Sequence, residues 1–313
     1  MPSEQLAELC DYLRTHPAVV EKAVIRQSYH DAAQTSGSIK LGDDTAAIPD
    51  GEEWLLMAGE AMLPNFISKE PWFAGYCAVM ANVSDIAAMG GRPLAIVDMI
   101  WKSDESLAET LWTGMKAASQ RYQVPIVGGH TSNCAPTTLL GASILGKAKR
   151  LLTSFDARPG DELLMAVDLR GAWYGDNPFW NASTTADEEQ LRGDIELLPQ
   201  IAEARLSNAA KDISNGGIFG TLMMLLECSN VGAQVDIDSI PRPDRCPLTH
   251  WSTAFPSFGY LITCLPENRH PIIERFNARG LSCESVGVIT AERALVLSDG
   301  DDSTTIWREN EIV

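Results

Sequence analysis

The chain has 313 residues, enough for two domains of ordinary size, and its 45% apolar and 21% charged content is typical of a globular protein. Its formal net charge of −18 argues against a basic surface that would bind nucleic acid or an anionic membrane. An acidic protein can still bind a phosphate compound if divalent cations lie between its carboxylates and the anion.

Signals for membrane insertion or export are missing from the sequence. No apolar run approaches the roughly 20 residues that a membrane-spanning helix needs. The first residues include Glu4, Glu8 and Asp11, whereas a signal peptide begins with basic residues. The seven cysteines are an odd number without a CxxC pair, which argues against a disulfide framework and a zinc knuckle. We therefore expect a cytoplasmic protein with reduced cysteines.

The first half of the chain predicts alternating helices and strands. Apolar residues at helical spacing predict a helix after Ser3, and Pro17 begins a second one that runs to about residue 33. The elements predicted next are a strand at 53–58, an apolar helix from about 73 to the Gly90-Gly91 pair, a strand at 94–101, a helix at 106–122, and strands at 124–127 and 139–146. This alternation is typical of a mixed α/β domain.

The second half begins after a turn at residues 157–161, which we interpret as the domain boundary. The predicted elements are a strand at 162–169, an irregular loop at 173–187, two helical segments, an apolar helix at 218–227, strands at 234–240 and 258–265, a helix at 271–278, and strands at 285–290 and 294–299. We divide the chain into N-terminal helices (1–34), an N-terminal domain (35–150) and a C-terminal domain (151–313).

Polar side chains gather where these elements begin or end. They are Asp43, Asp44, Glu60, Asn82, Asp85, Asp212, Ser214 and Asn215. Asn82 and Asp85 are three residues apart in an apolar helix, so both point to one side of it. Oxygen ligands at this density suit Mg²⁺, whereas zinc favours cysteine and histidine.

Each of these segments has a purely structural alternative. Asp43-Asp44 after a glycine could form a turn with an Asx hydrogen bond, and Glu60 could be an exposed carboxylate at a strand end. Asn82 with Asp85 could satisfy a neighbouring loop. Residues 212–217 could cap the helix that follows, or hold a phosphate at its N-terminus.

The segment Gly128-Gly129-His130 leaves similar alternatives open. The glycine pair could form a turn, or its backbone N–H groups could face a phosphate. His130 could donate a hydrogen bond to a nearby carbonyl, ligate a metal ion, or act as the base that deprotonates an acceptor.

Four segments in register carry a resemblance to a known family. They read GDDTAAI at 42–48, NVSDIAAMGG at 82–91, GGHTS at 128–132 and DISNGG at 212–217. They are similar to motifs of the aminoimidazole ribonucleotide (AIR) synthetase superfamily, which includes thiamine-monophosphate kinase, selenophosphate synthetase and the hydrogenase-maturation carbamoyl dehydratase. The similarity is closest to thiamine-monophosphate kinase, whose segments are of the types GDDAA, NLSDLAAMGA, GGDT and DxSDG. It spans roughly residues 35–295.

The resemblance implies a two-domain α/β (α+β) fold. In this fold the N-terminal domain forms a homodimer through a shared β-barrel-like sheet, and ATP and Mg²⁺ lie in an interdomain and intersubunit cleft. By position, Asp43, Asp85 and Asp212 match residues that hold the metal ions, and we add Glu60 as a further metal ligand. The expected catalytic residues are Asp43, Asp85, His130 and Asp212. The remaining expected nucleotide-binding residues are Asp44, Asn82, Gly128, Gly129, Thr131, Ser214 and Asn215.

The chain also departs from the family pattern. His130 stands where the family has Asp or Glu, Asn215 where the kinase has Asp, and Gly59-Glu60 where the kinase has a Thr-Asp pair. Loss of carboxylates predicts fewer or weaker metal ions.

The resemblance implies Mg²⁺-ATP-dependent phosphoryl transfer to an oxygen of a small molecule, either as a kinase or as an ATP-activated cyclisation or dehydration. The alternative is a catalytically weakened protein that binds ATP or ADP, or a scaffold. We expect no nucleic-acid or membrane partner.

Overall fold

The computed structural model describes residues 3–24, 39–133, 135–308 and 311–312. The chain forms two compact units. The first, here the C-unit, comprises Met1–Asp44, Leu151–Ser183 and Ile201–Val313, and the second, here the N-unit, comprises Thr45–Arg150 and Thr184–Gln200. The part of the predicted second helix beyond Val24 lies outside the described residues.

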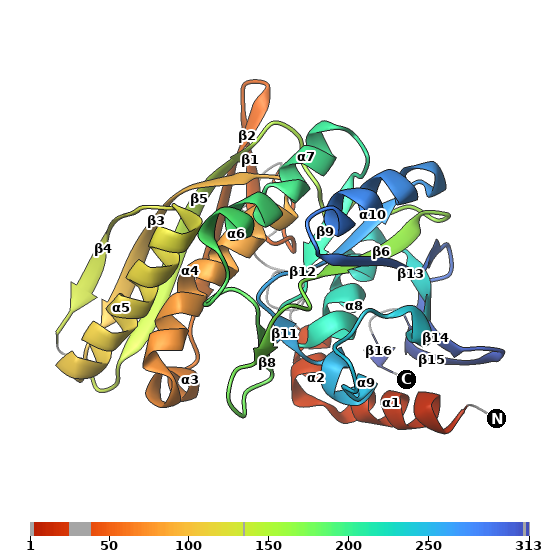
Figure 1. The fold of residues 1–313 in the computed structure, drawn as a ribbon, viewed down its shortest axis with the longest axis horizontal. Coiled ribbons are helices and arrows are strands. Elements are labelled where there is room, and N and C mark those ends of the chain that lie inside the picture. Colours follow the sequence, from red (N-terminus) through yellow and green to blue (C-terminus); the bar gives the residue numbers. More distant parts are fainter. Residues whose placement is uncertain (1–2, 25–38, 134, 309–310, 313) are drawn as a thin grey trace. The chain divides into compact units, whose positions relative to one another are not determined.

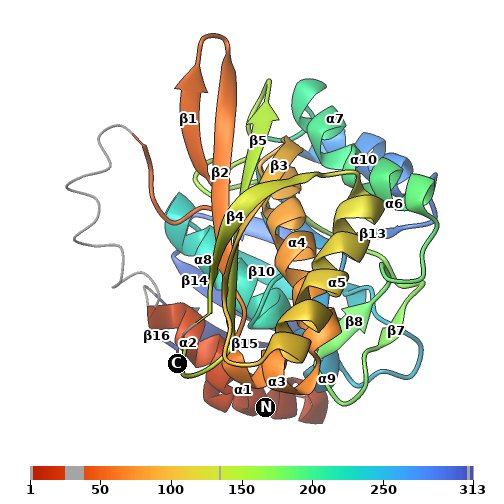
Figure 2. The same ribbon diagram turned by 90° about the vertical axis from the view of Figure 1, so that its left-hand side faces the viewer.

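The N-unit contains a five-stranded mixed sheet with the strand order β1-β2-β5-β3-β4. Its strands are β1 (Ala46–Asp50), β2 (Glu53–Ala61), β3 (Arg92–Trp101), β4 (Ile126–Ser132) and β5 (Leu139–Ala148). Its helices are α3 (Pro64–Lys69), α4 (Pro71–Ala88), α5 (Glu105–Tyr122) and α6 (Glu188–Ile195), and α7 (Leu197–Glu203) leads out of this unit. Strands β3 and β4 pair in parallel, because α5 connects them as a crossover, and the other described strand pairs of this sheet are antiparallel. The sheet of this chain is not a closed barrel, since β1 and β4 form its two edges (Figure 2).

Helices α4 and α5 lie side by side on one face of this sheet (Figure 1). Their close approach requires glycine. A Cβ atom at Gly75 would lie 2.0 Å from the carbonyl oxygen of Leu111, and a Cβ atom at Gly114 would lie 1.9 Å from that of Trp72. Helix α4 is buried on all sides from Phe73 to Ala88, as its continuous apolar sequence predicts.

The two faces of the N-unit sheet have different environments. Side chains alternate along each strand, so Leu56, Ile96 and Ile144 are buried on the helix side. We call the opposite face the open sheet face, because it carries exposed apolar side chains. They are Met57, Val97, Trp101 and Leu145, with exposed fractions of 55%, 40%, 39% and 40%. Met57 and Leu145 are direct cross-strand partners.

The C-unit is built on an eight-stranded mixed sheet with the order β16-β15-β14-β10-β13-β6-β12-β9. The strands are β6 (Glu162–Val167), β9 (Ala209–Asp212), β10 (Gly232–Asp236), β12 (Gly259–Cys264), β13 (Ser282–Thr290), β14 (Ala294–Asp299), β15 (Asp302–Arg308) and β16 (Glu311–Ile312). The helices are α1 (Glu4–Thr15), α2 (Pro17–Val24), α8 (Gly217–Ser229), α9 (Leu248–Ser252), α10 (Arg269–Asn277) and the 3₁₀ turns η3 (Ile237–Ser239) and η4 (Pro266–Asn268).

The apolar stripe predicted for the first helix is confirmed. Leu6, Leu9 and Leu13 of α1 are fully buried and belong to one core with Phe219 and Leu222 of α8. Together, the two units confirm the predicted two-domain mixed α/β fold. Among the described residues, no helix combines the length and apolar character needed to cross a membrane.

The prediction of an irregular loop at 173–187 is wrong in part. Short strands β7 (Ala172–Trp173) and β8 (Phe179–Asn181) pair with each other, and β8 pairs with the distant β11 (Phe255–Pro256). The ring of Trp180 packs edge-on against Trp173 and Trp251, with centroid distances of 5.4 and 5.6 Å. This aromatic packing orders a segment whose sequence has no periodic pattern.

Candidate functional site

The C-unit brings together four charged side chains, which we call the Lys211 cluster: Asp43, Asp44, Lys211 and Asp212. Asp43 and Asp44 lie shortly before β1, and Lys211 and Asp212 end β9. The Lys211 ammonium forms an ion pair with Asp44, and the two side chains are only 3% and 5% exposed. The backbone N–H of Asp212 donates to Asp44 Oδ2 at 3.3 Å.

Asp43 is held by a second set of hydrogen bonds. The Ser154 hydroxyl donates to Asp43 Oδ1 at 2.6 Å, and the Ser154 backbone N–H donates to Oδ2 at 2.9 Å. The carboxylate oxygens of Asp43 therefore have fixed positions beside the Lys211 ion pair. The Asx-turn alternative has partial support, because Asp43 Oδ1 also accepts from the Asp44 N–H at 3.0 Å.

Burial and mutual repulsion shape the charges of this cluster. Burial, followed by the neighbouring Asp44 carboxylate, raises the pKa of Asp43 to about 6, while Lys211 and the Ser154 hydrogen bonds act in the opposite direction. Burial alone would lower the pKa of Lys211, but the carboxylates of Asp44, Asp43 and Asp212 outweigh it and raise this pKa. Lys211 is therefore charged, and its ammonium faces the carboxylates of Asp44, Asp43 and Asp212.

The donor set of the Lys211 cluster fits Mg²⁺. Carboxylate oxygens of Asp44 and Asp212 lie within 4.8 Å of each other. Carboxylates are the hard ligands that Mg²⁺ prefers. Lys211 is a residue that the sequence analysis missed. The signal was a lysine in the apolar context Ala-Ala-Lys-Asp-Ile, because a lysine in a buried strand needs an acidic partner.

The segment after Asp212 does not cap its helix with a side chain. Helix α8 begins after Gly216, which has a φ of 94° and, as the N-cap residue, makes no side-chain cap hydrogen bond. Gly217 allows this entry, because a Cβ atom there would lie 2.2 Å from the Ser252 carbonyl oxygen. The capping alternative for Asp212, Ser214 and Asn215 is therefore wrong. Ser214 instead accepts from the Lys22 ammonium at 3.1 Å, and Asn215 is exposed.

In the N-unit, Asn82 and Asp85 lie on the buried helix α4. Asn82 is fully buried, and its Nδ2 donates to the carbonyl oxygens of Ala78 at 2.7 Å and of Ala142 on β5 at 3.4 Å. Its Oδ1 is buried without a hydrogen-bond partner in the described part of the chain. Asp85 is 7% exposed. Asn82 thus holds α4 against β5, and its predicted role at a nucleotide remains a prediction.

Glu60 and the glycine pair lie inside strands. Strand β2 continues through Ala61, so the predicted end of this strand at Gly59-Glu60 is wrong, and Glu60 is partly exposed in its interior. Gly128 and Gly129 belong to β4, so the turn alternative is also wrong. In the pairing of β3 with β4, Gly129 lies opposite Asp98, and a Cβ atom at Gly129 would come within 2.3 Å of the Asp98 carboxylate.

His130 and Thr131 point to opposite faces of the sheet. His130 lies opposite Met99 and Thr131 lies opposite Ile100, and side chains alternate along a strand. His130 therefore shares the side of Val97 and Trp101, while Thr131 shares the helix side. Within the described ranges, neither Glu60 nor His130 belongs to a group of three close metal-ligating side chains.

The fold of the chain has counterparts among solved structures. The structure titled "AaThiL complexed with AMPPCP and TMP" superposes with a TM-score of 0.69 at 18% identity and covers 91% of this chain and 96% of that one. The chain thus has the two-domain α/β fold of that protein.

Sequence comparison identifies the family. Residues 42–148 match the model "AIR synthase related protein, N-terminal domain", and residues 163–300 match the corresponding C-terminal domain. An uncharacterized protein of Synechocystis sp. is 45% identical over 271 residues, which cover 86% of this chain and 84% of the relative. Thiamine-monophosphate kinase of Pyrococcus abyssi is 31% identical over 221 residues, covering 65% and 68%. The chain belongs to the AIR synthase related family, which confirms the resemblance seen in its motifs.

Proposed function

We propose that the protein is a Mg²⁺-ATP-dependent enzyme that transfers the γ-phosphoryl group to an oxygen of a small molecule. The observation that carries this proposal is the Lys211 cluster, where Asp43 and Asp212, which match family metal positions, lie with Asp44 around Lys211, and carboxylate oxygens of Asp44 and Asp212 are within 4.8 Å of each other. Family membership supports it, since one relative is a thiamine-monophosphate kinase and one structural neighbour is complexed with AMPPCP, an ATP analogue, and TMP.

The residues have distinct proposed roles. Asp43, Asp85 and Asp212 would hold Mg²⁺, with Glu60 as a further ligand. Asp44 would pair with Lys211 and also face the metal ion beside Asp212. Bound Mg²⁺ would neutralise charge on the transferred phosphoryl group. The chain itself would orient the phosphates, because the first N–H groups of α8, which follow the N-cap Gly216, suit an anion.

The remaining predicted residues would act around the nucleotide and the acceptor. Asn82, Gly128, Gly129, Thr131, Ser214 and Asn215 would contact the nucleotide, and His130 would take the proton of the acceptor. His130 is exposed in the single chain and lies on the side of the open sheet face, so in the homodimer proposed below the acceptor would reach it at the subunit interface.

We also propose that the protein is a homodimer that pairs through the open sheet face. Four large apolar side chains are exposed there on one side of a single sheet. Contiguous exposed apolar surface of this kind marks interaction sites. We expect the wild type to sediment as a dimer. The Trp101→Lys variant should sediment as a monomer, with an unchanged circular dichroism spectrum. A monomeric wild type would contradict the dimer proposal.

Calorimetric titration with ATP, with and without excess Mg²⁺, tests the enzymatic proposal. We expect ATP binding that requires Mg²⁺ in the wild type and is weakened about tenfold or more by Asp212→Asn, because one metal-holding carboxylate is lost. The control is Asp50→Asn, which removes the same charge from exposed strand β1. Binding that ignores Mg²⁺, or equal effects of the two variants, would refute the proposal.

One observation favours a second function, a nucleotide-binding scaffold with weakened catalysis. Lys211 places a permanent cation among the carboxylates and occupies an oxygen of Asp44. A built-in cation reduces the need for one metal ion. In addition, His130 and Asn215 stand at two positions where the family pattern has carboxylates. Tight nucleotide binding without any slow Mg²⁺-dependent ATP hydrolysis would favour this function.

A further inference from the structure

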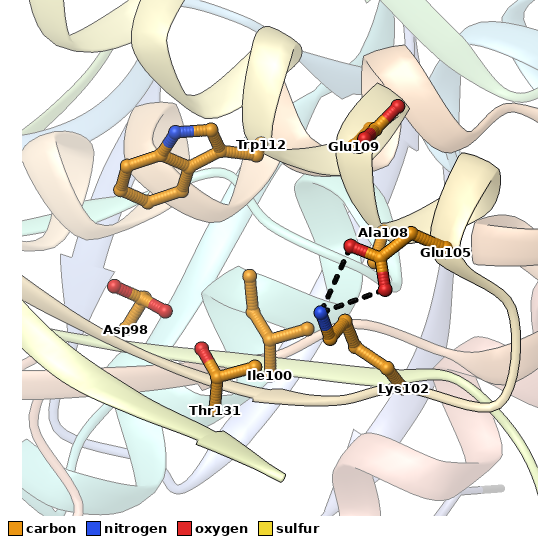
Figure 3. A pocket seen from close by; sticks show the side chains of 8 residues that line it. All are labelled: Asp98, Ile100, Lys102, Glu105, Ala108, Glu109, Trp112 and Thr131. Atoms are coloured by element: carbon orange, nitrogen blue, oxygen red, sulfur yellow. Dashed lines mark hydrogen bonds and ion pairs between the residues drawn. The ribbon is translucent and has the colours of Figure 1, made fainter. Parts of the chain in front are cut away.

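A pocket of about 270 Å³ lies within the N-unit between strands β3 and β4 and helix α5. Asp98, Ile100 and Thr131 line it from the strands, and Ala108, Glu109 and Trp112 line it from the helix (Figure 3). Its volume is near the lower end of the roughly 300–1,000 Å³ typical of ligand sites, so it suits a small molecule.

Asp98 has a buried carboxylate without a cationic partner among the described residues. It is 6% exposed, and its carboxylate has no hydrogen-bond or ion-pair partner among the described residues except its own backbone N–H. Gly129 makes room for this carboxylate, since any other side chain at that position would collide with it. An unpaired buried carboxylate is costly for folding, and native proteins usually provide such groups with a partner.

The lysine in the pocket does not supply that partner. Lys102 Nζ contacts Glu105 Oε1 and Oε2 at 3.0 and 2.9 Å, and the dashed lines in Figure 3 mark these contacts. Glu109 adds another acidic group at the exposed rim. The pocket therefore has a negative charge that its own residues leave unbalanced.

The side chains around Asp98 select the kind of cation. Figure 3 shows Asp98 and Thr131 rising from the strands toward the side of the pocket where the Trp112 indole extends from α5. A carboxylate forms strong hydrogen bonds with an ammonium or amidinium group, and an indole ring attracts an organic cation. Asp98, Glu105 and Glu109 do not form a group of three carboxylates close enough to hold a metal ion.

We propose that this pocket binds a small organic cation, with Asp98 as its counter-ion and Trp112 as the aromatic wall. An ammonium or amidinium group on a small apolar or aromatic body fits this combination. The proposal goes beyond the nucleotide reaction, because Asp98 and Trp112, which carry it, have no proposed role in that reaction, although Thr131, a proposed nucleotide contact, also lines the pocket.

Titration of the full-length protein with benzylamine at neutral pH tests this site, with benzyl alcohol as its neutral counterpart and benzoate as an anion. We expect saturable benzylamine binding that is about tenfold or more tighter than that of either comparison compound. Asp98→Asn keeps the shape of the side chain and should weaken benzylamine binding about tenfold or more. Glu52→Gln, which removes one charge from the exposed β1–β2 turn, should leave it within about twofold.

Fluorine NMR of protein labelled with 5-fluorotryptophan locates the bound probe. The Trp112→Phe variant identifies the Trp112 signal by its loss, and this signal should shift on addition of benzylamine. Equal affinities for benzylamine and benzyl alcohol, unchanged benzylamine binding by Asp98→Asn, or an unmoved Trp112 signal would each overturn the proposal.

The outcome of the ATP titration does not depend on the outcome of the benzylamine experiments. A protein that binds benzylamine at Asp98 but does not bind Mg²⁺-ATP retains the cation site and loses the proposed enzymatic function. The opposite result leaves the enzymatic function and removes the cation site.

Discussion

Replacement of Lys211 by methionine is the most direct perturbation of the charged cluster in the C-unit. Methionine keeps much of the apolar stem and removes the ammonium group. The ammonium that faces Asp43, Asp44 and Asp212 is then lost. The Lys211 and Asp44 side chains are only 3% and 5% exposed, so water screens this change poorly.

The expected loss is large for a single substitution. Removing one partner of a buried ion pair costs about 3–5 kcal/mol, because the other charge stays buried and uncompensated. Typical domains are stable by about 5–15 kcal/mol in total. Lys211→Met should therefore fold at 25 °C and lose a substantial part of its free energy of unfolding.

The loss should depend on pH in a definite direction. The pKa of Asp43 is already raised from 3.8 to about 6 in the folded protein, so its proton uptake stabilises the fold as the pH falls through 6. Removal of Lys211 raises the carboxylate pKa values further, since this ammonium lowers that of Asp43. The deficit of the variant relative to wild type should therefore grow as the pH rises from about 4 to above 6.

Urea unfolding followed by tryptophan fluorescence measures this deficit, at acidic and at neutral to basic pH, with EDTA or with excess Mg²⁺. Excess Mg²⁺ should restore part of the lost stability if the carboxylates hold it. Lys211→Arg, which keeps the cation, should lose less, and Lys147→Met, which breaks the half-exposed contacts to Glu53 and Asp50, should lose little. A loss below about 1 kcal/mol for Lys211→Met, or a loss equal at all pH values, would refute our account of the cluster.

Three further predictions concern the N-unit. Burial raises the pKa of Asp98, so Asp98→Asn should stabilise the protein at neutral pH by on the order of 1 kcal/mol, which corresponds to a rise of about 2–4 °C in Tm. This gain should shrink as the pH falls, because wild-type Asp98 then takes up its proton. A lowered Tm of the variant at neutral pH would contradict this prediction. Gly114→Ala should lose about 3 kcal/mol in urea unfolding because its Cβ meets the Trp72 carbonyl, whereas Gly128→Ala, with nothing within 4 Å, should change little. Asp85→Asn should weaken Mg²⁺-ATP binding in calorimetry far more than it changes the Tm without ligand, and a variant that fails to fold would mark Asp85 as structural.

Much of the local structure follows from the sequence alone. The stripe of Leu6, Leu9 and Leu13 predicts the buried side of α1, and the predominantly apolar sequence of α4 predicts a helix without a solvated face. Such patterns depend on neighbours along the chain, so a single sequence contains them. The order of four short motifs was also sufficient to identify the family.

The environment of each polar side chain depended on contacts between distant segments. Lys211 is balanced by Asp44, which lies 167 positions earlier in the chain, and no local pattern predicts such a pair. Strand β8 is ordered by β11, more than 70 residues later, which explains why the segment around it looked irregular.

The same reason explains the candidate sites in the N-unit. His130 and Thr131 are neighbours in sequence but are placed on opposite faces, because their segment is a strand paired with β3 and not a turn. That pairing also sets Asp98 against Gly129 and creates the pocket under Trp112. The sequence by itself determined most of the longer helices and strands and the family to which the chain belongs. Only the tertiary structure decided which charges are neutralised and which remain unpaired, because these depend on distances in space between segments far apart in the chain.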